Sequence, residues 1–206
     1  QLALIPIYGW CVYIWDVTFT QLPLSYADAG AATFRDFAHF YVLGFVARLR
    51  YVEALYSVPI QQALQQRLVP SPVDTVFPPS YGPQFALLFT PFSALPYVPA
   101  LLLWLATTTA LYAVCMYLVW RAMPHLRTRR WPVFVLCAAA PALHMLLIYG
   151  QNSAIALSAF TAAFFAFVRG RHLAAGAAIG CLFYKPQLGI AAAVLLVGAG
   201  QWRAVA

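Results

Sequence analysis

The chain has very little charge, and negative charge is absent from most of its length. Of the 206 residues, 8% are charged and 64% are hydrophobic, and the mean hydropathy is +0.78. Soluble domains contain about 25% charged residues, so this composition excludes an ordinary soluble domain and indicates a polytopic membrane protein. No acidic residue follows position 74, so a catalytic carboxylate must come from positions 16 to 74. The five acidic residues are Asp16, Asp28, Asp36, Glu53 and Asp74.

The cysteines lack the spacing of a metal site, and the basic residues lack the pattern of a nucleic-acid-binding protein. The cysteines lie inside apolar segments, where free thiols pack as small hydrophobic side chains; they are Cys11, Cys115, Cys137 and Cys181. The net charge of +7 comes from arginines that separate apolar runs instead of gathering on one soluble face. The chain starts at Gln1 and stops at Ala206 within an apolar stretch, so we expect the N-terminal part of a longer protein, cut at both ends.

Apolar runs long enough to cross a bilayer recur along the chain. A spanning helix needs about 20 apolar residues. The predicted spans are 2–19, 98–120, 132–149 and 151–168. A last apolar stretch is interrupted at Lys185 and Pro186, which predicts two short helices, 173–184 and 187–199. The predicted fold is all-α, a polytopic transmembrane helical bundle forming a single domain over 1–206.

The placement of arginine predicts the orientation of these spans. Four arginines lie in 121–130 and two in 169–171, whereas 150–152 has none. Short arginine-rich loops stay in the cytoplasm, so 150–152 and the long loop 20–97 are predicted to lie outside. Within that loop we expect an amphipathic interfacial helix over 34–49, a second helix over 59–68 and a short interfacial or re-entrant helix over 84–95.

One polar group lies in the predicted outer loop, in the sequence RDFAHFY, residues 35–41. On a helix, Asp36 and His39 are three residues apart and share one face. An ionised carboxylate at the membrane surface can act as a general base. The alternative is that Asp36 only caps or solvates an interfacial helix.

Two further polar groups interrupt the apolar part of the chain. Gly150, Gln151 and Asn152 join two predicted spans, and they form either a simple tight turn or part of a site. Lys185 lies about 12 residues into an apolar run, where an ionisable side chain is costly and usually faces a polar cavity. A cation in a low-dielectric cavity suits a phosphate group. We therefore expect Lys185 to face the Asp36 side of an outer cavity and to bind a phosphate.

Four segments resemble, in order, the motifs of glycosyltransferase family 87. They are RDFAHFY (35–41), FPPSYGPQFALLFTPFSALPY (77–97), GQNSAIAL (150–157) and RGRHLAAGAAIGCLFYKPQLGI (169–190). The family comprises polytopic enzymes of the GT-C type and includes polyprenol-phosphate-mannose-dependent α-1,2-mannosyltransferases. The resemblance implies inverting transfer of a sugar, with mannose the best-known case, from a polyprenyl-phosphate donor to an extracytoplasmic glycan or lipid acceptor. It also implies an integral protein of a bacterial inner (plasma) membrane that needs no cofactor.

The resemblance also implies roles for individual residues. Asp36 matches the family's acidic residue and would be the general base, with Asp28, nearer the first span, as the rival. The residues expected to bind substrate or phosphate are His39, Tyr81, Gln151, Asn152, Lys185 and Gln187. No metal is expected, because Asp28 and Gly30 do not form the DxD motif of nucleotide-sugar enzymes. The alternative function is a secondary transporter or lipid flippase, since broken helices with an intramembrane charge are also typical of transporters.

Overall fold

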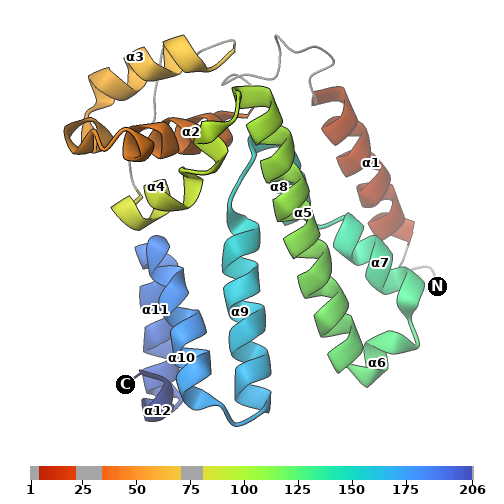
Figure 1. Cartoon of the computed structure of the whole chain (residues 1–206). Coiled ribbons are helices and arrows are strands. Elements are labelled where there is room, and N and C mark those ends of the chain that lie inside the picture. The colour runs from red at the N-terminus through yellow and green to blue at the C-terminus, as the bar shows by residue number, and fades with distance from the viewer. Residues whose placement is uncertain (1–4, 22–33, 71–80, 206) are drawn as a thin grey trace. The chain divides into compact units, whose positions relative to one another are not determined.

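The computed structural model describes residues 5–21, 34–70 and 81–205, and these ranges contain helices and no strand (Figure 1). The predicted all-α fold is confirmed. The chain divides into two compact units, Gln1–Asn152 and Ser153–Ala206, which we call unit 1 and unit 2 and describe separately. A single domain over 1–206 stays a prediction.

The longest helix described in unit 1 is α5, Tyr97–Ala122. Helix α5 starts directly after Pro96, whose φ of −56° is already near the helical value. The first charged residue in α5 is Arg121. Of the helices in the described ranges, α5 alone is long and apolar enough to cross a membrane as one unbroken helix. Its bounds agree with the predicted span 98–120, and the fold is consistent with an all-α membrane protein.

The run predicted as one span over 132–149 is a bent pair of helices. Helix α7, Arg130–Ala138, and helix α8, Pro141–Tyr149, meet at 42°. The bend follows from Pro141, because a proline ring disfavours helical backbone at the preceding residue, and Ala140 is extended with ψ 124°. Counted together, the pair is the second element of unit 1 that could cross a membrane.

Helix α1, Ile5–Gln21, packs against α7 and α8. Two hydrogen bonds between side chains and distant residues fix this contact. The Trp10 indole Nε1 donates to the Ala139 carbonyl oxygen at 3.0 Å, and Thr18 Oγ1 and His144 Nδ1 form a hydrogen bond of 2.6 Å. Polar side chains of these apolar helices thus find hydrogen-bond partners on a neighbouring part of the chain, which a buried group such as the Thr18 hydroxyl requires.

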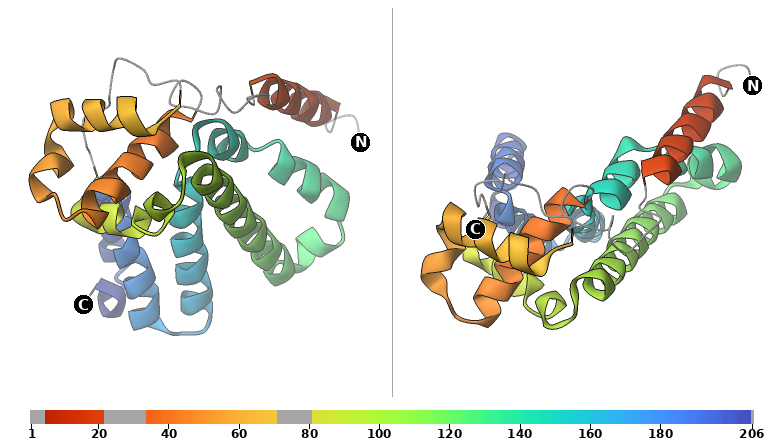
Figure 2. Two further views of the ribbon diagram at one scale, coloured as in Figure 1. Left: turned by 45° about the horizontal axis from the view of Figure 1, so that its top comes forward. Right: turned by 90° about the horizontal axis from the view of Figure 1, so that it is seen from above.

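A cluster of short helices surrounds α2, Arg35–Arg48. Its other members are η2 (Val52–Tyr56), α3 (Val58–Leu68), α4 (Pro83–Phe89) and η3 (Phe92–Ala94). Helices α3 and α4 flank α2 (Figures 1 and 2), and nine of the 14 residues of α2 are buried. The amphipathic pattern predicts one buried face, and the structure encloses the helix on most sides. A Cβ added to Gly44 would lie 2.4 Å from the Phe89 carbonyl oxygen, so α2 and α4 touch through their backbones.

Unit 2 consists of apolar helices that are too short to qualify as single spans by length. They are α9 (Ser153–Val168), α10 (His172–Gly180), η4 (Cys181–Tyr184), α11 (Pro186–Gly198) and α12 (Trp202–Val205). Lys185 separates η4 from α11 and has extended backbone, φ −119° and ψ 93°. The break falls where the sequence predicts it, because Pro186 fits the first position of a new helix but cannot continue an old one.

Candidate active site

The site begins at the first turn of α2, where Asp36 lies at the edge of a buried aromatic cluster. Asp36 is half-buried, whereas Arg35 is exposed and Phe37 is fully buried. At the start of the helix, the Ala38 amide donates a hydrogen bond to the Phe34 carbonyl at 2.9 Å. An acidic side chain in the first turn is stabilised by the helix dipole. The carboxylate is therefore held on a rigid element and keeps partial access to solvent.

Tyr81 connects Asp36 to the turn that follows α8. The pKa of the Tyr81 phenol is raised, mainly by burial and additionally by the negative charge of Asp36, while a side-chain hydrogen bond with Asn152 lowers it. The Tyr81 ring stacks on Phe85 with centroids 4.4 Å apart. The structure thus brings together three of the predicted site residues, Asp36, Tyr81 and Asn152, although they come from three separate parts of the sequence.

The Gly150–Asn152 turn is built against α2. Gly150 has φ +65°, and a Cβ there would lie 2.6 Å from the Phe37 Cβ, so both the backbone conformation and the space demand glycine. The buried Trp104 indole of α5 donates to the Gly150 carbonyl oxygen at 2.8 Å. Asn152 is 1% exposed and Gln151 is half-buried. This turn is therefore part of the packed structure around Asp36, more than a simple surface connection.

His39 lies one turn further along α2, close to Tyr81. Its side chain is 6% exposed, and neither ring nitrogen has a hydrogen-bond partner within the described ranges. Its ring centroid lies 6.3 Å from that of Tyr81. Burial lowers the pKa of His39 to about 4, so the imidazole is neutral at pH 7. A neutral ring does not attract phosphate by charge, which argues against the phosphate-binding role expected for His39.

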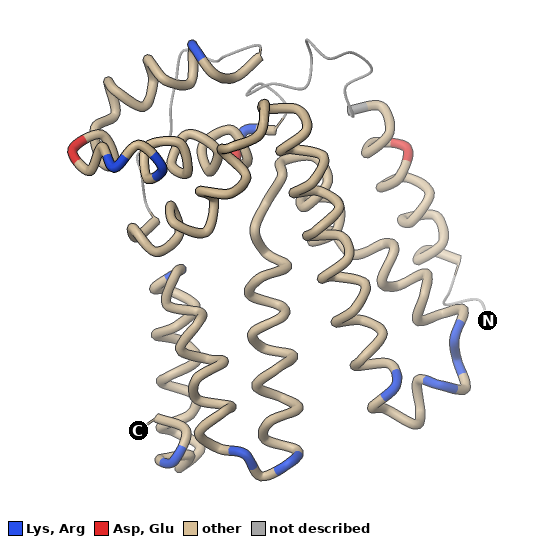
Figure 3. Tube along the Cα trace, in the orientation of Figure 1, with Lys and Arg blue, Asp and Glu red and all other residues tan. Residues whose placement is uncertain are grey.

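All these groups lie at the Tyr97 end of α5. The Tyr97 ring packs on Phe37 at 5.4 Å and on Tyr41 at 5.2 Å, and the Tyr41 hydroxyl donates to the Leu95 carbonyl at 2.7 Å. The arginine-rich stretch 121–130 follows the opposite end of α5 (Figure 3). Within unit 1, Asp36 and the Gly150–Asn152 turn thus share the end of α5 that is remote from these arginines.

The predicted phosphate-binding residues Lys185 and Gln187 belong to unit 2. Lys185, the only lysine of the chain, is half-buried, and its Nζ lies 5.9 Å from the centroid of the Tyr184 ring. Its carbonyl oxygen accepts hydrogen bonds from the amides of Leu188 and Gly189, which start α11. Gln187 is exposed in the first turn of that helix. The structure groups these two residues with each other, and their approach to Asp36 stays a prediction.

Sequence reasoning missed Trp104, and one predicted residue cannot be placed. Trp104 holds the Gly150 turn, and the available signal was an indole N–H inside an apolar run, which needs an acceptor when buried. Asp28, the rival base, lies outside the described residues. In the part of the chain that the structure describes, no three His, Cys, Asp or Glu side chains gather where they could hold a metal ion. Metal independence stays a prediction.

More than half of the chain matches the model of a known protein family. The model of glycosyltransferase family 87 matches residues 80–206. No curated protein and no solved structure matches the chain at a significant level. The matched range contains Tyr81, Asn152 and Lys185 and starts after Asp36, so the assignment of Asp36 depends on its position in this structure. The match favours sugar transfer over the transporter or flippase alternative.

Proposed function

The chain belongs to glycosyltransferase family 87, and from this premise we propose that it transfers a sugar from a polyprenyl-phosphate donor, with Asp36 as the general base. Family membership makes it an enzyme that uses a sugar donor and an acceptor. The finer proposal is that the sugar is mannose and the acceptor is a glycan or lipid on the extracytoplasmic side of a bacterial inner membrane. The chain would cross that membrane several times.

The observation that carries the proposal is the grouping of Asp36, Tyr81 and Asn152 around one partly exposed carboxylate. Asp36 is the acidic residue of that group, and the phenol and amide supply hydrogen bonds beside it. A carboxylate in this position can accept a proton from an attacking hydroxyl. The half-buried Tyr81 phenol can orient a sugar hydroxyl without competing for that proton, and the buried Asn152 amide holds the phenol.

The proposed reaction is a single displacement. The acceptor hydroxyl loses its proton to Asp36 while its oxygen forms a bond to the anomeric carbon of the donor sugar. The bond between that carbon and the phosphate oxygen breaks, and the lipid phosphate leaves with the electron pair. Because attack and departure occur on opposite faces, the anomeric configuration inverts. A phosphate leaving group requires a nearby positive charge, and we assign that role to Lys185.

His39 has a different role in this proposal from the one first expected. It is buried and neutral, and its ring lies 6.3 Å from that of Tyr81. We therefore assign it as a positioning residue that fixes the Tyr81 ring. Gln187, exposed beside Lys185, and Gln151, beside Asn152, complete the proposed set of polar groups that contact the substrates.

The decisive experiment measures sugar transfer in membranes supplied with polyprenyl-phosphate mannose. Asp36→Asn is expected to lower the rate by about 10²–10⁴-fold, which is typical for loss of a general base. Asp16→Asn is the matched control, because Asp16 is exposed on α1. Normal transfer by Asp36→Asn together with loss of transfer by Asp28→Asn would contradict the proposal and move the role to Asp28.

The role of Lys185 is tested separately through the donor concentration. Lys185→Ala is expected to raise the apparent KM for the donor, and Lys185→Arg to restore it only partly, because a planar fork replaces a point charge. Arg171→Ala is the control, since it removes one positive charge from an exposed position of the same unit. A donor KM that is unchanged in Lys185→Ala would remove Lys185 from the site and leave the proposal for Asp36 intact.

A further inference from the structure

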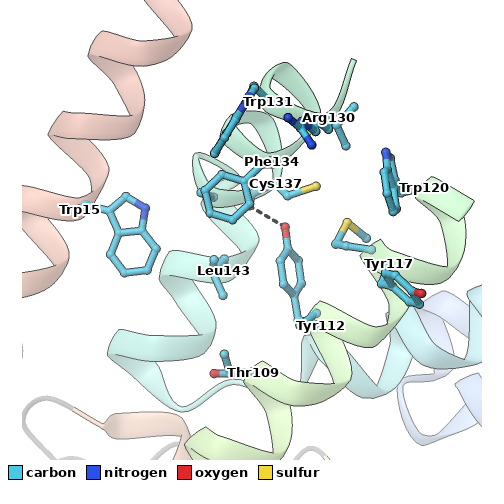
Figure 4. A pocket seen from close by; sticks show the side chains of 14 residues that line it. Trp15, Thr109, Tyr112, Tyr117, Trp120, Arg130, Trp131, Phe134, Cys137 and Leu143 are labelled. Carbon is cyan, nitrogen blue, oxygen red and sulfur yellow. Dashed lines mark hydrogen bonds between the residues drawn. The ribbon is translucent and has the colours of Figure 1, made fainter. Parts of the chain in front are cut away.

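Unit 1 contains a cavity of about 640 Å³ between α1, α5, α7 and α8, separate from the residues of the candidate active site (Figure 4). Its walls are formed mainly by aromatic and aliphatic side chains. The Tyr112 side chain of α5 extends into the cavity, and its hydroxyl donates a hydrogen bond to the Cys137 carbonyl at 2.8 Å. This hydroxyl therefore already has a hydrogen-bond partner within the protein. The interior therefore offers apolar contact and little polar recognition.

Large aromatic side chains on these walls are left uncovered. Trp131 and Phe134 are each 63% exposed, and Tyr117 is 50% exposed. In a membrane protein such exposed apolar side chains face the bilayer, and aromatic ones are typical of its interface; here they gather around a groove. The occupant that these walls select is therefore itself apolar along most of its length.

The groove has the length of one membrane leaflet. Its α5 wall extends from Thr109 to Trp120, which is about 16 Å at 1.5 Å per residue. The hydrocarbon core of a bilayer is about 30 Å thick, so this wall covers roughly half of it. An acyl chain that belongs to a single leaflet matches this dimension.

Four of the eight arginines of unit 1 lie at one end of this groove, and all five acidic residues of the unit lie elsewhere in the sequence. Arg130 lines the groove beside Trp131, with its guanidinium carbon 5.9 Å from the ring centroid. Arg121 is also close, since its Nη1 donates to the Tyr117 hydroxyl at 3.2 Å. The stretch 121–130 contains four arginines and no acidic residue. Tryptophan, tyrosine and arginine together are typical of the level of the lipid headgroups, and basic pockets there bind anionic headgroups.

We propose that this groove binds an anionic phospholipid of the surrounding bilayer, with its acyl chains against the aromatic walls and its phosphate beside Arg130. Two independent features support this assignment, the apolar walls one leaflet long and the charge at one end. Either feature alone would fit a broader range of partners. The inference does not depend on the role of Asp36, so it can fail without affecting the proposed reaction.

The first test fills the groove. The purified chain is reconstituted in nanodiscs of dioleoyl phosphatidylglycerol and dioleoyl phosphatidylcholine in equal amounts, and the lipids retained after release are counted by native mass spectrometry. Ala113 lines the groove, whereas its neighbour Val114 is exposed and does not. Ala113→Trp is expected to reduce retained phosphatidylglycerol at least about 5-fold relative to Val114→Trp. Equal retention by these two variants would overturn the proposal.

The second test concerns the charge. Arg130→Gln is expected to remove the preference for phosphatidylglycerol over phosphatidylcholine, while Arg129→Gln, which changes the net charge equally but lies outside the groove lining, is expected to keep it. Wild-type protein that retains both lipids equally would overturn the anionic assignment. Displacement of phosphatidylglycerol by polyprenyl phosphate, or a groove covered by a second copy of the chain in cross-linking, would overturn the choice of occupant.

Discussion

The two ends of α5 use aromatic residues in opposite ways. At the Tyr97 end, Phe37 and Phe89 are fully buried and Trp104 is 2% exposed, and they pack directly on neighbouring rings. At the Trp120 end, Trp131 is 63% exposed and lines an open groove. Both ends are rich in aromatic residues, so composition alone does not separate them. What separates them is burial, because Trp131 and Phe134 contact each other edge to face and still leave 63% of each side chain exposed.

This difference has a functional consequence. The packed end fixes polar groups in place, because the Gly150 turn is held by Phe37 and Trp104 and carries Asn152 beside Tyr81. A catalytic arrangement needs this rigidity. The open end has positive charge at its rim and exposed apolar walls, which suits a lipid whose chains are mobile. Four predictions compare the two ends directly.

The largest expected effect is on pH dependence. His39 at the packed end has its pKa lowered by burial from 6.5 to about 4. As the pH falls below 6.5 the unfolded chain binds a proton that the folded chain does not bind until about pH 4, so the free energy of unfolding decreases by about 3 kcal/mol over this range. His39→Gln is expected to remove this part of the decrease, as measured by denaturant titration in detergent at several pH values. His125→Gln, at an exposed position near the other end, should leave it unchanged, and an equal effect of both variants would refute the assignment.

The next effect concerns close packing between helices. Gly44→Ala places a Cβ 2.4 Å from the Phe89 carbonyl, and overpacking of this kind costs about 1–3 kcal/mol. Gly9 on α1 has no atom within 4 Å of an added Cβ, so Gly9→Ala is expected to be neutral or to stabilise by about 0.5 kcal/mol through helix propensity. Thermal unfolding in detergent measures both variants. Equal melting temperatures would show that α2 and α4 are less closely packed than described.

Much of this arrangement follows from local sequence signals. The uninterrupted apolar run predicts α5 to within a residue or two at each end, and Pro186 predicts the break beside Lys185, because both depend only on neighbouring residues. The bend between α7 and α8 had its own signal in Pro141, which the sequence-based prediction of one span over 132–149 did not use.

Other features could not be predicted because no local pattern encodes them. The contact between Gly150 and Phe37 joins residues more than 100 positions apart, and the sequence shows only that Gly150 suits a turn. The enclosure of α2 depends on α3 and α4, whose own sequences predict helices and not their positions. The same limit applies to His39, since its pKa depends on burial that a helical repeat does not determine.

A smaller effect is expected from the hydrogen bond that holds the active-site turn. Trp104→Phe keeps an aromatic ring but leaves the Gly150 carbonyl without its donor at 2.8 Å. A lost buried hydrogen bond costs about 1–2 kcal/mol, and we expect the rate of sugar transfer to fall about 10-fold because Asn152 follows in the same turn. Trp131→Phe at the open end is the control and should keep the rate within about 2-fold. Equal rates for both variants would show that the turn does not position the site.

The smallest effect compares two tyrosines on α5 itself. Tyr112, which lines the groove, donates to the Cys137 carbonyl at 2.8 Å, and that oxygen also accepts the Ala140 amide at 3.4 Å. Tyr112→Phe therefore leaves the acceptor partly satisfied and is expected to cost about 0.5–1 kcal/mol.

The buried Tyr97 hydroxyl at the packed end has no hydrogen-bond partner within the described ranges. Removing an unpaired buried hydroxyl relieves a desolvation cost, so Tyr97→Phe is expected to be neutral or slightly stabilising. Parallel denaturant titrations should give changes of opposite sign or at least a difference of about 0.5 kcal/mol. A loss in Tyr97→Phe as large as that in Tyr112→Phe would mean that the Tyr97 hydroxyl has a polar partner, and the packed end would then hold one more group able to take part in the site.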